Sequence, residues 1–226
     1  MDLKNILALY KTEVYKYYKP TTPENVIIQT WLIFDSHEDY FSKYLGFYRN
    51  LPDFTQLIIH AVDGTFELTN NGIKHFIKHN HQKTYTQNGV TKGINQEVLR
   101  NVRNNLLKEI DKLEIANTFE QLFNIISNAK ERGFGPLAIY DTSVRIGTYL
   151  GLEPSKVFLH AGAQAGMKLL EQKGYVQLGL SEELFVDIHY LPLELQELKP
   201  LVTEHFLCSQ KDQLKLLPEI KFLEKK

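Results

Sequence analysis

Three polar residues between positions 141 and 160 have types and spacing that suit catalysis. Asp141 and Arg145 stand four residues apart, so a helix would place both on one face as an ion pair. His160 follows in an apolar run that ends at Gly162. If the three side chains converge in one pocket, they are the candidate catalytic residues of an enzyme. The alternative is a surface ion pair and a histidine that fills the core or caps a helix.

Three histidines form the pattern His-x-x-x-His-x-His at His75, His79 and His81. A helix would place His75 and His79 on the same face, where their imidazoles are candidate ligands for a transition metal. Zinc requires a third or fourth ligand, and Lys74 and Lys78 add positive charge that opposes a cation. We therefore interpret this segment as the solvated, mildly basic end of a helix, and we expect no metal and no cofactor.

A glycine-rich turn, Gly133-Phe-Gly-Pro136, lies between two stretches of helical period. Glycine permits positive φ and close backbone approach, and the first amides of the second helix form an anion site. Such a helix–hairpin–helix predicts nucleic-acid binding by Lys130, Arg132, Gly133, Gly135, and the amides of Leu137 and Ala138. The alternative is an ordinary turn, because glycine commonly ends one helix and proline begins the next.

Charge and cysteine content restrict the classes of protein to consider. The 226 residues carry a formal net charge of -1 with a pI of about 6.7, so any nucleic-acid contact must come from a local basic patch. The single cysteine, Cys208, excludes a disulfide within the chain and fits a reducing, cytoplasmic compartment. His205 precedes it by three residues, but we interpret Cys208 as a small buried side chain. No run of 18 apolar residues exists, so we expect no membrane span and no signal peptide.

Elements of helical period must position these residues. Apolar residues recur every three or four positions in the stretches 3–17, 24–34, 36–48, 54–62, 95–113, 118–129, 136–150 and 163–172. Short helices interrupted by prolines follow. Residues 64–94 are irregular and are the best candidate for a subdivision of the chain. Near 83–92 we expect either a small β-hairpin closed at Asn88-Gly89 or a mobile loop. The predicted fold is therefore mainly α: one multi-helix globular domain, 1–226, with a helix–hairpin–helix-like central turn.

The order of motifs around the central turn resembles part of the helix–hairpin–helix DNA glycosylases. In that family a Gly-x-Gly-Pro hairpin and its helix lead to a short apolar segment and another helix, as residues 133–136 and 157–162 do here. The family carries its catalytic aspartate near that segment, whereas residues 155–166 contain no acid. The helix after the turn also lacks the lysine that some members use as nucleophile. The resemblance therefore implies a scaffold rather than glycosylase activity.

A closer similarity is to a group of uncharacterised bacterial proteins. It rests on Gly135-Pro-Leu-Ala-Ile-Tyr-Asp141, on Arg145-Ile-Gly147 and on Val157-x-Leu-His-Ala-Gly162. The group implies a bacterial source and assigns no activity.

Two functions of different classes remain open at this point. The first is a helical protein that binds DNA or RNA through the central turn. The second is a non-catalytic interaction or assembly module, whose aromatic helices pack on a protein partner or a second copy. The aromatic residues on those helices are Tyr10, Tyr40, Tyr44 and Tyr48.

Overall fold

The computed structural model describes residues 1–87 and 90–220. Contacts within the chain divide it into two compact units. Unit 1 contains Met1–Glu13, Ser36–Glu38 and the chain from Pro154 onward, and unit 2 contains Val14–Asp35 and Asp39–Glu153. The stretch 64–94 falls within unit 2, so the division lies elsewhere than the sequence pattern favours. In the described ranges, no helix is both long enough and apolar enough to cross a membrane.

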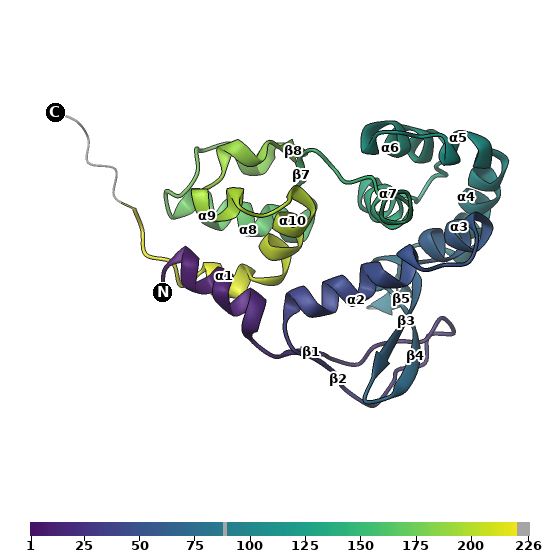
Figure 1. Cartoon of the computed structure of the whole chain (residues 1–226), viewed down its shortest axis with the longest axis horizontal. Helices are drawn as coiled ribbons and strands as arrows, with labels where there is room; N and C mark the ends of the chain where they lie inside the picture. The colour runs from purple at the N-terminus through teal and green to yellow at the C-terminus, as the bar shows by residue number, and fades with distance from the viewer. Residues whose placement is uncertain (88–89, 221–226) are drawn as a thin grey trace. The chain divides into compact units, whose positions relative to one another are not determined.

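The prediction of a mainly α fold is wrong, because the described residues combine helices with four two-stranded antiparallel sheets (Figure 1). The strands of unit 2 are β1 (Tyr15–Tyr17), β2 (Leu32–Phe34), β3 (Thr65–Asn70), β4 (Ile73–Lys78), β5 (Thr84–Gln87) and β6 (Val90–Gly93). Its helices are α2 (His37–Arg49, whose first two residues belong to unit 1), α3 (Phe54–Asp63), the 3₁₀-helix η1 (Asn80–Gln82), α4 (Gln96–Lys108), α5 (Ile110–Glu114), α6 (Phe119–Asn128) and α7 (Pro136–Leu150). Helix still predominates, so the fold is mixed α and β.

One reason for the wrong fold class lies in residues 24–34, whose apolar period predicts a helix. Asn25 has a left-handed φ of 66° and donates its backbone N–H to the Thr22 carbonyl, so a tight turn forms where a helix would begin. Leu32–Phe34 then pairs antiparallel with Tyr15–Tyr17, with its residues alternately buried and exposed. An alternation over three residues is too short to be distinguished from a helical period in the sequence.

A second reason lies in residues 65–78, where β3 and β4 form a hairpin. Asn71 and Gly72 close it with φ of 50° and 76°, and two left-handed residues are what a type I′ turn requires. The small hairpin expected near 83–92 is confirmed, since β5 pairs antiparallel with β6. The Asn88-Gly89 turn that was expected to close it lies outside the described residues.

Helix α7 forms the centre of unit 2. Its residues are buried almost without interruption from Ala138 to Gly147, and it packs against α3 and α6. Helices α6 and α7 lie side by side and are joined by the central turn (Figure 1). Thr118 caps α6, because its hydroxyl accepts the backbone N–H of Gln121 at the start of that helix. The local signals on both sides of the turn therefore position it as the sequence predicts.

Unit 1 packs a second core around α8 and α10. Its elements are α1 (Leu3–Thr12), β7 (Val157–Phe158), α8 (Ala161–Gln172), η2 (Leu180–Glu182), β8 (Phe185–Val186), η3 (Ile188–Tyr190), α9 (Leu193–Gln196), α10 (Pro200–Ser209) and α11 (Lys211–Leu214). Apolar residues of α1, α8 and α10, among them Ile6, Met167 and Phe206, are buried together. A Cβ on Gly166 would lie 2.3 Å from the Leu207 carbonyl oxygen, so glycine allows α8 and α10 to approach this closely.

Candidate functional site

The turn between α6 and α7 presents backbone amides at the surface. Gly133 adopts a left-handed φ of 101°, and Gly135 is the N-cap of α7, followed by Pro136 in its first turn. Phe134 stands between the two glycines with 2% of its surface exposed, so it anchors the turn in the core. Because its N-cap is a glycine, α7 has no side-chain cap hydrogen bond among the residues that the structure describes. The helix start therefore has N–H donors and the positive end of its dipole available for an anion.

The surroundings of the turn leave space for a ligand. Among the described residues, a Cβ built on Gly135 would meet no atom of a non-neighbouring residue within 4 Å, and one on Gly133 would meet the Val98 side chain at 3.7 Å. Lys130 and Arg132 are exposed on the chain that enters the turn. Ala138 has a buried side chain, so its contribution to a ligand would be its backbone N–H. We name Lys130, Arg132, Gly133, Gly135, Leu137 and Ala138 the hairpin surface.

A groove of about 340 Å³ lies beside the hairpin surface, between α4, α5 and α6. Asn128 and Ala129 line it at the end of α6, and the exposed Lys108 and Lys112 line it from the other side. The Asn105 amide donates to the Ala129 carbonyl at 3.2 Å, which fixes α4 against the chain entering the turn. Two further lysines therefore flank the segment that leads into the hairpin surface.

Arg145 is part of the core of unit 2 and not of a surface ion pair. Its side chain is fully buried, and its guanidinium donates three hydrogen bonds. Nε donates to the Tyr44 hydroxyl at 2.6 Å, Nη1 to the Ala61 carbonyl at 2.8 Å, and Nη2 to the Gln82 side-chain oxygen at 3.0 Å. Asp141 Oδ2 lies 3.5 Å from Nη2. Arg145 thereby ties α2, α3 and η1 to α7.

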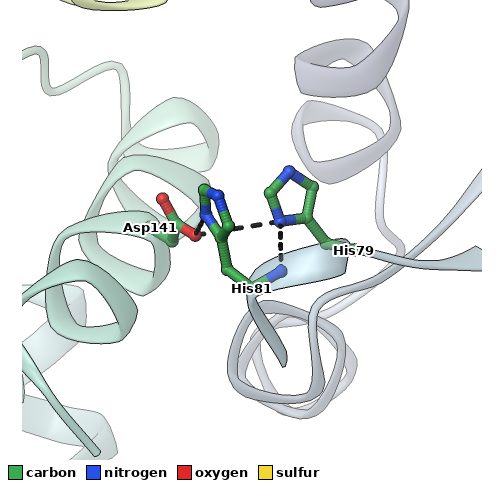
Figure 2. Close-up of side chains that lie close together, drawn as sticks. All are labelled: His79, His81 and Asp141. Carbon is green, nitrogen blue, oxygen red and sulfur yellow. Dashed lines mark hydrogen bonds and ion pairs between the residues drawn. The ribbon is translucent and has the colours of Figure 1, made fainter. Parts of the chain in front are cut away.

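Asp141 meets two histidines that come from the end of the β3–β4 hairpin. Figure 2 shows His79 and His81 pointing toward Asp141 of α7 from the adjoining segment. His81 Nδ1 lies 2.8 Å from Asp141 Oδ2, and His79 Nδ1 lies 3.9 Å from the same oxygen. The His79 ring also accepts the backbone N–H of His81 at 3.4 Å, so its Nδ1 carries no proton. One ligand atom from each residue lies within 4.8 Å of the others.

The charges around this cluster fix the ionisation of two of its members. Burial raises the pKa of Asp141, but His81, Arg145 and His79 lower it more, so the carboxyl pKa lies well below its usual range. Burial and the neighbouring His81 hold the pKa of His79 well below the ordinary value, despite the Asp141 carboxylate. Asp141 is therefore an ionised acceptor at neutral pH and His79 a neutral imidazole, which leaves His81 as the donor to Asp141.

The candidate metal ligands His75 and His79 do not lie on one helix face, as the helical interpretation of this segment requires. His75 lies in β4 opposite Leu68, because residues 73–78 are a strand. His79 instead lies beside His81 and Asp141, and Asp141 is sixty residues beyond His81 in the chain. Sequence reasoning misses this group because no local spacing connects η1 with α7. The two signals that remain are the His-x-His spacing and an aspartate inside an apolar helix.

His160, the third candidate catalytic residue, belongs to unit 1, whereas Asp141 and Arg145 belong to unit 2. It is the N-cap of α8, with Nδ1 3.2 Å from the Gly162 backbone nitrogen, which donates to the ring only when Nδ1 is unprotonated. The other ring nitrogen bonds the Glu204 carboxylate. Burial lowers the pKa of His160, but hydrogen bonds with Cys208 and Glu204 outweigh burial and raise the pKa to about 10. The capping interpretation is thus confirmed, with a buried ion pair that the sequence does not reveal.

Cys208 has His160 as its basic neighbour and not His205. Its side chain is half-buried and hydrogen-bonds His160, and its sulfur would lie 2.3 Å from a Cβ on Gly162. His205 faces Tyr10, whose hydroxyl lies 2.9 Å from Nδ1. Burial, reinforced by His37 and His160, lowers the pKa of His205 to about 3. Since burial also raises the pKa of Tyr10, its hydroxyl donates to a neutral His205.

The four tyrosines considered as a partner-binding stripe are buried within the chain. Tyr10 and Tyr48 are 0% exposed, and Tyr40 and Tyr44 are 8% and 6% exposed. Tyr44 holds Arg145, and Tyr48 donates its hydroxyl to the Thr65 carbonyl at 3.1 Å. These rings are used inside the units, so a partner surface would have to be formed by other residues.

We compared the chain with protein-family models, curated proteins and solved structures. No protein-family model, no curated protein and no solved structure matches the chain. The similarities to uncharacterised bacterial proteins and to part of the helix–hairpin–helix glycosylases therefore stay predictions, and function must be argued from the chain's own residues.

Proposed function

We propose that this protein binds nucleic acid through the phosphodiester backbone, at the hairpin surface between α6 and α7. The observation that carries the proposal is the open space in front of the uncapped α7 amides at Gly135. A phosphate oxygen placed there accepts backbone N–H bonds and is favoured by the helix dipole. Lys130 and Arg132 supply the positive charge that drives release of counterions from the nucleic acid.

The chemistry of these groups favours binding without sequence preference. Backbone amides and flexible cations contact phosphate, and they carry no pattern that reads base edges. Lys108 and Lys112 of the neighbouring groove extend the positive charge to further phosphates, although Lys112 also pairs with Glu109 at 2.5 Å. We therefore expect binding that depends strongly on salt and weakly on sequence.

The first test is a fluorescence-anisotropy titration with short single- and double-stranded DNA and RNA, at low and at moderate salt. For duplex DNA, each phosphate neutralised contributes about 0.9 to the slope of log affinity against log salt, so replacing Lys130 and Arg132 with alanine lowers that slope by about 2. Lys4→Ala with Lys11→Ala, on the exposed side of α1, is the matched control for charge removal and leaves the slope unchanged.

A substitution at Gly135 separates binding from folding. Its φ of -79° suits any residue, and the space around it is open, so a side chain fits without strain. In Gly135→Asp the carboxylate caps α7 and occupies its first amides, so nucleic-acid binding is abolished. The free energy of unfolding stays equal or rises by roughly 0.3 kcal/mol. Gly135→Asn has the same shape without the charge and retains more affinity. No binding by the wild type at low salt, or unchanged binding by Gly135→Asp, would contradict the proposal.

A further inference from the structure

We propose that His79, His81 and Asp141 form a binding site for a divalent transition-metal ion of the zinc class. The two imidazoles and the carboxylate converge from η1 and α7 (Figure 2), with their ligand atoms within 4.8 Å of one another. This inference goes beyond the proposed nucleic-acid binding and does not depend on it.

The relationship between His79 and Asp141 is the strongest argument for a cation. His79 Nδ1 and Asp141 Oδ2 are both lone-pair acceptors, yet they face each other at 3.9 Å. Two acceptors gain nothing from this approach unless a positive group lies between them. The backbone N–H of His81 reaches Nδ1 only at 3.4 Å, which is a long hydrogen bond. A metal ion between the two atoms would use both lone pairs.

The distances suit tetrahedral coordination after small movements. Bonds of 2.0–2.1 Å to nitrogen or oxygen place neighbouring tetrahedral ligands about 3.3 Å apart. The ion takes the place of the proton on His81 Nδ1, so this ring must bind as the tautomer that carries its proton on Nε2. The 2.8 Å separation of His81 and Asp141 must then widen by about half an ångström, and the 3.9 Å separation of His79 and Asp141 must shrink by a similar amount. Three protein ligands then leave a fourth position for water or a substrate.

The donor set indicates which ions the site prefers. Two imidazoles and one carboxylate suit zinc, iron(II), cobalt or nickel better than magnesium or calcium, which prefer oxygen ligands alone. His79 is neutral at ordinary pH, as a ligand must be, and Asp141 is ionised. The Arg145 guanidinium, 3.5 Å from Asp141 Oδ2, lowers the affinity for a dication. We therefore expect binding weaker than in a four-ligand structural zinc site.

Solvent can reach the cluster from the side of His81. The His81 side chain is 33% exposed, against 20% for His79 and 15% for Asp141. The ion can therefore enter without unfolding of unit 2, while Asp141 lies deepest and fixes the position of the ion relative to α7.

The test is a titration of the chelator-treated protein with Co²⁺, followed by its visible ligand-field absorption and by competition with Zn²⁺. One ion per chain is expected. Loss of a ligand in His79→Ala or His81→Ala should weaken binding at least about tenfold, since loss of an outer-shell partner already costs about 10–100-fold. His75→Ala is the matched control, because it removes the third histidine of the same motif from β4 and leaves the cluster intact.

Folding of the variants is checked by circular dichroism. His79→Ala is the most informative variant, because the hydrogen bond that it removes at Nδ1, from the His81 amide, is a long one. The proposal is overturned if the wild type shows no cobalt spectrum at about 1 mM Co²⁺. Binding too weak to be seen there has a dissociation constant above about 1 mM. Equal affinities of the folded His79→Ala variant and the wild type would also overturn the proposal. Nucleic acid is absent from this experiment, so its outcome is separate from that of the anisotropy titration.

Discussion

The Arg145 guanidinium and the Tyr44 hydroxyl are joined by a 2.6 Å hydrogen bond in the core of unit 2, between helices α7 and α2. Arg145 also lies 5.9 Å from the centre of the Tyr44 ring, within the range of a cation–π contact. A charge that is fully buried is stable only when every polar neighbour is in place. The sequence presents Arg145 as a partner in a surface ion pair, whereas in the structure it is a buried donor that connects several elements of the core.

Arg145→Met should destabilise the protein strongly. The substitution keeps an extended side chain but removes the guanidinium from the Asp141 carboxylate, the Ala61 carbonyl and the Gln82 amide oxygen. Breaking a buried pair in this way costs about 3–5 kcal/mol. Urea unfolding at neutral pH measures the loss.

Arg103→Met is the matched control for Arg145→Met. Arg103 pairs with Asp63 at 2.7 Å, but its side chain is 27% exposed. Solvent screens such a pair, so the loss should be about 1 kcal/mol or less. Equal effects of the two substitutions would show that Arg145 acts as an ordinary ion-pair partner and not as a buried centre.

Stability should fall as pH rises from 6.5 to 10 because of His160. Hydrogen bonds with Cys208 and Glu204 overcome the effect of burial and raise the pKa of His160 from 6.5 to about 10 in the folded protein. In this window the folded state keeps a proton that the unfolded state releases. The stabilisation is therefore complete below pH 6.5 and is lost toward pH 10, with a slope of up to about 1.4 kcal/mol per pH unit.

Urea unfolding of the wild type and of His160→Gln across this window measures the contribution. The variant should lose stability less steeply than the wild type as the pH rises. His189→Gln changes an exposed histidine of the same unit and should leave the slope of the wild type unchanged. Parallel slopes for the wild type and His160→Gln would show that His160 has an ordinary pKa.

Gly166→Ala should destabilise unit 1, because the new Cβ would lie 2.3 Å from the Leu207 carbonyl oxygen and 2.9 Å from its carbonyl carbon. Backbone atoms cannot move away as a flexible side chain can, so α8 and α10 must separate. Overpacking of this kind costs about 1–3 kcal/mol. Thermal unfolding compares it with Gly135→Ala, whose Cβ meets no atom within 4 Å. A larger loss in Gly135→Ala than in Gly166→Ala would contradict this account of the two glycines.

The turn around Gly133 is predictable from sequence because its signals are local. Glycine at the left-handed position, proline in the first turn and a Thr118 cap each act within a few residues. The β3–β4 hairpin also carries a local signal, Asn71-Gly72, but the strands that flank it lack a clear period of two. The spacing of the histidines therefore predicts a helix at His75, where the structure has strand β4.

The candidate metal cluster depends on a contact that no local pattern contains. His81 and Asp141 are sixty residues apart, and their meeting requires the packing of η1 against α7. The same holds for Glu204, which meets His160 only because α10 packs on α8. Spacing rules predict which residues share one element, whereas these pairs are decided by which elements share a core.

The discontinuity of unit 1 has a consequence for synthesis on the ribosome. Helix α1 is made before unit 2, but its buried residues Leu3, Ile6 and Tyr10 pack against segments beyond residue 154. An isolated helix of ten residues is marginal in water, so α1 has no stable partner while unit 2 emerges and folds. Helix α1 should therefore acquire its native contacts only after the chain of unit 2 and the segments beyond residue 154 have been made.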